Sequence, residues 1–274
     1  MSRPPWPHCP SMDLTLTPIG TSPAWYNPGE PNSGFVLDAE GFRVLIDCGG
    51  GVISRYLELY GPDQPIDAVV ISHVHADHCF DLVPLKFGID YGSLGKWRPQ
   101  LWLPPNARNR LTRMVSMWDE SFDFFTDTFD VREYGTGRGF QVGPFACSAM
   151  DVPHYIESCA LRFEQGGTVF GYTGDLGPNS DVAPFLAGAD LVLAEAAFSE
   201  DGPLDLRGRG HITATEAAEI ARDARAHSLL LTHIPVELGQ ARAVEAAFAA
   251  FDGPVAAARS GETYVVARRL AAAG

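Results

Sequence analysis

Three histidines and one aspartate lie within six consecutive positions, at His73, His75, Asp77 and His78. Imidazole nitrogens and carboxylate oxygens are ligands that zinc accepts, so this density favours a metal site over a polar loop. His73 and His75 are two positions apart and can face one point from an extended loop, whereas Asp77 and His78 turn toward a second point. The spacing therefore fits two metal ions better than one.

Further candidate ligands lie far apart along the chain, each just past an apolar run. They are His154 in Val-Pro-His, Asp175 in Tyr-Thr-Gly-Asp and His233 in Leu-Thr-His. The cluster itself follows the apolar residues 66–71, whose short, β-branched run predicts a buried strand. The ends of several strands therefore bring ligands to one place.

These motifs resemble the dinuclear metallo-β-lactamase superfamily, and the similarity covers residues 12–268. The resemblance implies an α+β fold, a four-layer αββα sandwich with a dinuclear metal site at one edge of the sheets. It assigns the ligands as follows: His73, His75 and His154 to one metal, Asp77, His78 and His233 to the other, and Asp175 as the bridge between them. The implied cofactors are two Zn²⁺ ions per chain, and Mn²⁺ or Fe²⁺ fits the same ligands.

Two later motifs resemble the RNase Z branch of this superfamily. They are Ala-Glu-Ala-Ala-Phe around Glu195 and Gly-His-Ile-Thr-Ala around His211. The resemblance implies that His211 contacts the scissile phosphate or protonates the leaving oxygen, and that Glu195 orients it. A carboxylate beside an imidazole also keeps the ring protonated, as that role requires. A histidine that only caps a helix is the alternative.

Four residues are candidates for substrate binding. Arg207 and Arg209 form a cationic spot next to His211 on an acidic chain, which fits a phosphate or a solvated loop equally well. Trp25 and Tyr26 lie in a long first loop, where they fit stacking on a base or covering of the core.

The chain departs from RNase Z in ways that bear on substrate size. The long tRNA-gripping arm of that branch is usually inserted between the ligands that correspond to His154 and Asp175, where this chain has only residues 155–174. The formal net charge of −14 disfavours long polyanions such as extended nucleic acid. Residues 229–235 and 251–255 are similar to RNase-Z-like cyclic-nucleotide phosphodiesterases of actinobacteria.

We therefore predict a bacterial phosphodiesterase that hydrolyses a small phosphodiester, with a cyclic nucleotide as first candidate and a metal-bridging hydroxide as nucleophile. Asp77 would bind a metal and orient the attacking water. One alternative is an RNase Z-like tRNA 3′-processing endonuclease without the arm. Another is a metal-binding module without catalysis, which would not need Glu195 and His211.

The domain organisation is predicted to be simple. Residues 1–11 are expected to be a disordered, Pro-rich leader, and residues 12–274 a single domain. Residues 14–19 predict an edge strand, residues 35–37 and 44–46 a hairpin, and residues 131–150 strands of a second sheet. Three glycines at 49–51 predict a tight turn beneath the metal loop, followed by a helix to residue 60.

Two further helices are predicted in the carboxyl half. Thr213 and Glu216 form a capping box, which places the start of a helix at about residue 214. Val244, Phe248 and Phe251 predict the apolar stripe of another.

The sequence also bears on the protein's environment. No apolar run approaches the ~20 residues that a membrane-spanning helix needs, so no membrane contact and a cytoplasmic location are expected. Five isolated cysteines indicate reduced thiols without a disulfide framework. Members of the RNase Z branch often form homodimers, and the resemblance extends this expectation to the chain.

Overall fold

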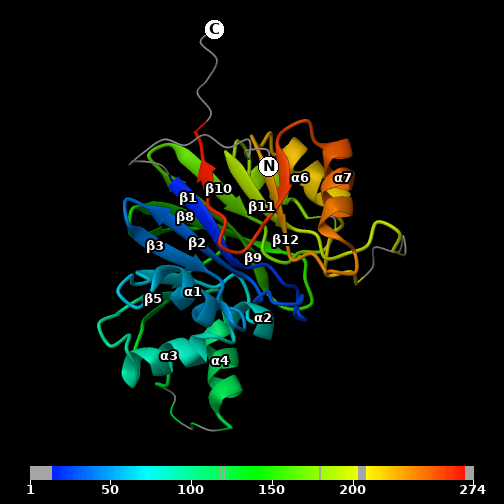
Figure 1. Ribbon diagram of the computed structural model, residues 1–274. Helices are drawn as coiled ribbons and strands as arrows, with labels where there is room; N and C mark the ends of the chain where they lie inside the picture. Colours follow the sequence, from blue (N-terminus) through cyan, green and yellow to red (C-terminus); the bar gives the residue numbers. More distant parts are fainter. Residues whose placement is uncertain are drawn as a thin grey trace.

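The protein is described here from a computed structural model, which covers residues 14–117, 119, 121, 123–178, 180–202 and 208–268. Within these residues, two mixed seven-stranded sheets face each other (Figure 1). The first has the order β14-β1-β2-β3-β4-β5-β6 and the second the order β13-β12-β11-β10-β9-β8-β7. The predicted leader at residues 1–11 lies outside the described residues.

The strands of the first sheet are β1 (Leu14–Gly20), β2 (Gly34–Ala39), β3 (Phe42–Ile46), β4 (Ala68–Val70), β5 (Gln100–Leu103), β6 (Asp130–Glu133) and β14 (Tyr264–Val266). Those of the second are β7 (Gly139–Val142), β8 (Phe145–Val152), β9 (Ser158–Gln165), β10 (Thr168–Tyr172), β11 (Leu191–Glu195), β12 (Leu229–Thr232) and β13 (Val255–Ala257). The helices are α1 (Val52–Tyr60), α2 (Ala76–Cys79), α3 (Leu82–Asp90), α4 (Ala107–Val115), α5 (Val182–Phe185), α6 (Ala214–Asp223) and α7 (Gln240–Ala250).

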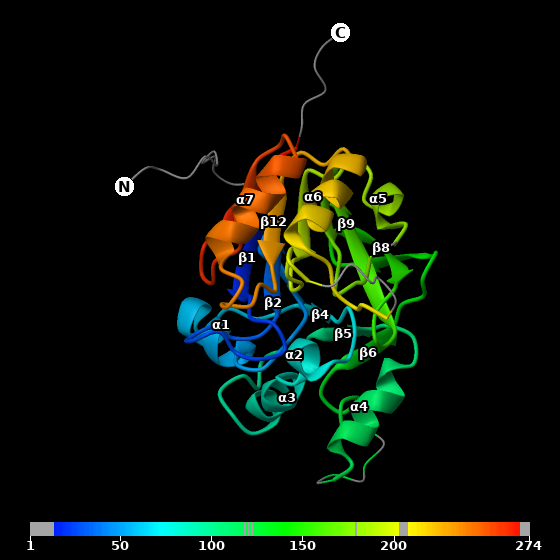
Figure 2. The ribbon, with the colours of Figure 1, turned by 90° about the vertical axis from the view of Figure 1, so that its right-hand side faces the viewer.

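The core is divided into three layers of buried side chains. The inner layer joins the two sheets, with Leu16, Phe35, Phe163 and Phe170 among its members. A second layer packs α1, α3 and α4 on the first sheet, and a third packs α6 and α7 on the second. Figure 2 shows α1 to α4 on one side of the sheets and α5 to α7 on the other. The four-layer αββα sandwich predicted from the sequence is confirmed.

Two strand assignments made from the sequence were wrong. β1 is not an edge strand, because β14 pairs antiparallel with it on the side away from β2, with Leu16 opposite Tyr264. β6 belongs to the first sheet and not the second, since it runs parallel to β5. Both errors concern which strand lies next to which, and periodicity within a single segment does not encode such long-range pairing.

Predictions of local structure, such as the hairpin turn and the helix cap, were confirmed. Glu40 and Gly41 both have positive φ, as a two-residue hairpin turn between β2 and β3 requires. The capping box of α6 is present, with the Thr213 hydroxyl accepting from the Glu216 amide and the Glu216 carboxylate accepting from the Thr213 amide. The α7 stripe is partly wrong, because Phe248 is exposed and Ala247 is buried. No helix in the described residues is both long and apolar enough to cross a membrane.

Candidate metal centre

The loop between β4 and α2 places the first four candidate ligands. β4 is parallel to both neighbours and fully buried, so its carboxyl end presents this loop at the rim of the sheet. Beneath it the Cys48 amide donates to the His78 carbonyl oxygen over 2.8 Å. A Cβ on Gly49 would lie 2.0 Å from the Asp77 carbonyl oxygen, so only glycine allows this approach. The tight turn predicted beneath the metal loop is present.

His73, His75 and His154 form the first group of candidate ligands, which we call the open group because His75 and His154 are only half-buried. Their ring centroids lie 5.0, 5.0 and 4.8 Å apart, an almost equilateral arrangement. His75 Nδ1 is 3.0 Å from His154 Nε2. Burial, aided by the neighbouring imidazoles, lowers the pKa of His73 and His75, which favours neutral rings with free lone pairs.

A second, buried group consists of Asp77, His78, Asp175 and His233. Asp175 Oδ2 lies 3.3 Å from His78 Nε2 and 3.2 Å from His233 Nε2. The same oxygen is 3.9 Å from His73 Nε2 in the open group. Asp175 therefore lies between the two groups, where a bridging ligand would have to be. Burial opposes ionisation of Asp77, but the His78 and His233 imidazoles lower its pKa to about 2.

Backbone geometry brings two of these ligands into place. His233 has a φ of 59°, a left-handed conformation that is costly for a residue with a side chain. Gly174, directly before Asp175, has the same φ of 59°, and a Cβ there would lie 2.7 Å from the Cys159 carbonyl oxygen. The chain thus turns sharply at two ligand positions.

Hydrogen bonds behind four of the histidine ligands select one tautomer of each ring. The Asp47 carboxylate accepts from His78 Nδ1 over 2.8 Å and from the Ser72 and Tyr172 hydroxyls, each also over 2.8 Å. Because the Ser72 hydroxyl donates to Asp47, it accepts from His73 Nδ1 at 3.1 Å. With Nδ1 protonated, Nε2 of His73 faces the centre as a lone pair. Burial opposes the charged form of His78, but the Asp175, Asp47 and Asp77 carboxylates raise its pKa, so a metal ion would have to displace the proton on its Nε2.

Two more of the histidine ligands are held in the same way. His233 Nδ1 meets the Ser33 hydroxyl at 3.1 Å, and His154 Nδ1 donates to the Gly210 carbonyl oxygen over 2.7 Å. The sequence reading missed these supporting residues, although Asp47 gave a signal, being a polar residue directly after an apolar strand. Its φ of 57° is a second strained position at the centre.

The donor set fits divalent metal ions. Among the described residues, His73 Nε2, His78 Nε2 and Asp175 Oδ1 are buried without a hydrogen-bond partner. Buried polar atoms normally find a partner, since leaving one unsatisfied costs about 1–3 kcal/mol. Imidazole and carboxylate ligands without thiolate suit zinc and, on the same atoms, manganese or iron. The candidate ligands named from the sequence are therefore brought together in two adjoining groups.

Glu195 and His211 form a hydrogen-bonded pair beside Asp175. His211 Nδ1 lies 3.0 and 3.1 Å from the two Glu195 oxygens and 3.9 Å from Asp175 Oδ2. The Glu195 oxygens also accept from the Leu176 and Ala197 amides, which fixes the carboxylate. Burial opposes the charged ring, but the Glu195 carboxylate raises the pKa of His211 to about 9. At neutral pH the ring therefore carries the proton, beside the centre.

The candidate substrate-binding residues make other contacts or face solvent. The Arg209 guanidinium pairs with Glu216 and lies over the Phe198 ring, 4.6 Å from its centroid. Its charge is thus already matched within the protein, which disfavours a phosphate contact. Trp25 and Tyr26 are exposed, and Asn27 beside them bonds to the Ile234 carbonyl oxygen and the Val236 amide. Arg207 lies outside the described residues.

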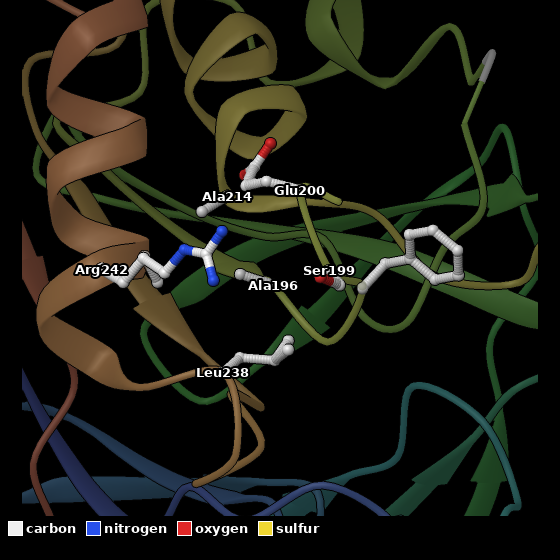
Figure 3. A pocket seen from close by; sticks show the side chains of 8 residues that line it. Ala196, Ser199, Glu200, Ala214, Leu238 and Arg242 are labelled. Atoms are coloured by element: carbon white, nitrogen blue, oxygen red, sulfur yellow. The ribbon is translucent and has the colours of Figure 1, made fainter. Parts of the chain in front are cut away.

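A small pocket lies beside the centre, between the loop that follows β11 and the start of α7. Figure 3 shows the Arg242 side chain reaching across it toward Ala196 and Ser199, with Leu238 below. Arg242 also pairs with Asp201 over 2.5 Å. None of the candidate metal ligands lines this pocket, so it is separate from the centre.

The fold and the ligand pattern define a metallo-β-lactamase protein, and comparison with known proteins agrees. Residues 42–234 match the family described as "Beta-lactamase superfamily domain", and the chain belongs to this metallo-β-lactamase superfamily. The uncharacterized protein Rv1339 of Mycobacterium tuberculosis is 33% identical over 95% of this chain and 95% of its own length.

Two other relatives have more specific names. The probable metallo-hydrolase YhfI of Bacillus subtilis is 30% identical over 90% of this chain and 98% of that protein. Its crystal structure matches with a TM-score of 0.80 at 27% identity, covering 92% of this chain and 99% of that one. Ribonuclease Z of Myxococcus xanthus is 27% identical over 91% of this chain and 97% of its own.

Proposed function

We propose that the protein is a metal-dependent hydrolase that cleaves a small phosphodiester, with a cyclic nucleotide as first candidate. The observation that carries this proposal is the Glu195–His211 pair, whose imidazolium lies 3.9 Å from the central Asp175 carboxylate. A mere metal store does not need a proton donor at this place. The relatives named metallo-hydrolase and ribonuclease Z support the reaction class.

The ligands would be the seven residues of the open and buried groups: His73, His75, His154, Asp77, His78, Asp175 and His233. Two divalent ions held there would act as Lewis acids and lower the pKa of an attacking water toward neutrality. Zinc is the first candidate for both ions.

The chain's own residues would then move protons and orient groups. Asp77, whose pKa is low, remains a carboxylate and can accept a hydrogen bond from the attacking water. As the water oxygen bonds to phosphorus, the bond from phosphorus to the leaving oxygen breaks. His211 donates its proton to that oxygen, and Glu195 stabilises the imidazolium before the transfer and holds the ring in position. The proton that the water loses passes to solvent, from which His211 is protonated again. The products are a phosphomonoester and an alcohol, which for a cyclic nucleotide are two groups of one molecule.

The small-substrate proposal rests on what surrounds the centre. The segment between His154 and Asp175 is taken up by β9, β10 and their connections, which leaves no length for a tRNA-gripping arm. Arg209, two positions before His211, is paired with Glu216. These features, with the net charge of −14, disfavour a substrate that needs many phosphate contacts.

The test compares two substrates on enzyme loaded with zinc or manganese. We expect hydrolysis of 3′,5′-cyclic AMP and no cleavage of a 3′-extended tRNA precursor, at low and at moderate salt. Cleavage of the tRNA with an untouched cyclic nucleotide would instead favour an armless RNase Z, the reading that the Myxococcus relative supports. Binding to tRNA should then fall steeply with salt.

A further inference from the structure

The two groups of the metal centre differ in their access to solvent. His75, His154 and His211 are half-buried, whereas the candidate ligands His73, Asp77, His78, Asp175 and His233 are buried. A substrate therefore reaches the centre from the side of His75, His154 and His211. Side chains that border this open side are therefore in position to contact the groups attached to the phosphate of the substrate.

Tyr155 borders this open side. It follows His154 directly, and its ring centroid lies 5.1 Å from that of His154 and 5.7 Å from that of His211. Despite these two contacts the residue is 60% exposed. One face or edge of the phenol ring thus meets the centre while much of it remains open to solvent.

Gly210 makes room for this ring. A Cβ at position 210 would lie 2.5 Å from Tyr155 Cε2, closer than real Cβ atoms approach other atoms. Gly210 is not among the glycines with positive φ, so its backbone conformation does not call for glycine. With glycine at position 210, the Tyr155 ring can lie against the backbone there, and any larger residue would push the ring away from this place.

Two other exposed aromatic residues, Trp25 and Tyr26, are less well placed. Trp25 and Tyr26 are in the loop that supports His233 through the Thr21 carbonyl oxygen and the Ser33 hydroxyl, on the buried side. Within the described residues, neither ring makes an aromatic contact with a candidate site residue. Tyr155 is therefore the better candidate for a stacking surface.

We propose that Tyr155 forms a substrate subsite, on which a planar aromatic substituent of the phosphodiester, such as a nucleobase, stacks. This inference rests on the proposed function and names the part of the substrate that the open side would recognise. Because every base has a π-face, such a subsite would favour nucleobase-bearing substrates without selecting one base.

The experiment compares 3′,5′-cyclic AMP with its abasic counterpart, ribose 3′,5′-cyclic phosphate. Tyr155→Leu should raise KM for cyclic AMP by about tenfold, the order expected for one base stacked on an aromatic side chain. KM for the abasic compound should change by less than about twofold, and metal content should be unchanged. Tyr155→Phe, which keeps the ring, should behave like the wild type with both substrates.

A binding measurement makes the test independent of turnover. Calorimetry should show that Tyr155→Leu weakens binding of AMP, also by about tenfold, but leaves binding of ribose 5-phosphate unchanged. Tyr91→Leu is the matched control, since Tyr91 is 83% exposed at the end of α3 and its ring lies against that of Phe87, 6.0 Å between centroids. It should alter neither measurement.

Three results separate the possible failures. Equal losses with the nucleoside and abasic compounds would overturn the subsite and make Tyr155 a support for His154 or His211. No change in either would overturn it as well. A wild-type enzyme that hydrolyses neither compound would contradict the proposed function itself, and the comparison of AMP with ribose 5-phosphate would still decide the role of Tyr155.

Discussion

The open and buried groups of the metal centre differ in their exposure to solvent and in the number of carboxylates that they contain. The open group contains three imidazoles and no carboxylate of its own, and two of its rings reach the surface. The buried group places two carboxylates and two imidazoles away from solvent. Burying charge is costly unless it is paired, so the buried group depends more strongly on a cation and on the residues behind it.

This difference assigns separate tasks to the two sides. The buried side is held by the Asp47 carboxylate and by a strained backbone at His233, so its geometry is set before any substrate arrives. On the open side lie His211, Glu195 and Tyr155, the groups we propose to act on the substrate. Substitutions on the two sides should therefore differ in whether they change metal content or only turnover.

The largest effect is expected where the groups meet. Asp175→Asn keeps the shape of the side chain but removes the charge that lies between them. Turnover should fall by roughly 10⁴-fold, since metal-derived stabilisation is worth several kcal/mol, and bound metal should drop below one ion per chain. Elemental analysis of the purified variant beside turnover measures both. Full metal content in the variant would show that Asp175 is not a shared ligand.

Loss of the proton donor should separate turnover from metal content. His211→Ala should lower kcat by about a thousandfold, within the range for general acid catalysis, while bound metal stays at the wild-type value. His227→Ala is the matched control, because His227 is an exposed histidine away from the centre. An unchanged kcat in His211→Ala would contradict its proposed role and leave the ring as a structural partner of Glu195, because the N-cap of α6 is Thr213 and not His211.

Features of the site that depend on residues close together in the sequence could be predicted, whereas contacts between residues far apart in the sequence could not. Four candidate ligands could be named because they lie within six positions of one loop, and His154, Asp175 and His233 because each follows an apolar run. Strand ends in such a sandwich meet at one rim. Partners that are distant in sequence could not be foreseen. The Arg209 guanidinium forms an ion pair with Glu216, which the sequence indicated only as part of a capping box. Asp47, at the end of a strand in the first sheet, accepts a hydrogen bond from Tyr172 in the second sheet.

The same limit applied to the fold. The hairpin and the capped helix α6 are local and were predicted correctly, whereas the pairing of β14 with β1 joins the two ends of the described chain. Several sequence expectations stay predictions: a single domain over residues 12–274, zinc as the metal, a cytoplasmic location and a homodimer.

A smaller effect is expected from the residue behind the buried group. Asp47→Asn removes the charge that accepts from His78 Nδ1 and from the Ser72 hydroxyl. Metal affinity should weaken by about 10–100-fold, as is usual for supporting residues of this kind. Competition with a chelator measures the change. Asp67→Asn is the control, since Asp67 accepts a backbone hydrogen bond from the Arg43 amide and is not part of the centre. Equal weakening of metal affinity in both variants would argue against a specific role of Asp47.

The finest comparison is the order in which the two groups release metal. The open group has half-buried rings and no carboxylate of its own. A chelator should therefore remove the ion of the open group about tenfold faster than the ion of the buried group. Tenfold in rate corresponds to a difference of ~1.4 kcal/mol in the activation free energy of release. Stopped-flow release into a metal-sensitive dye should then show two phases. His154→Ala, which removes one ligand of the open group only, should abolish the fast phase and preserve the slow one. Loss of the slow phase instead would mean that the two ions are held as one unit, with Asp175 coupling them too strongly for the groups to act separately.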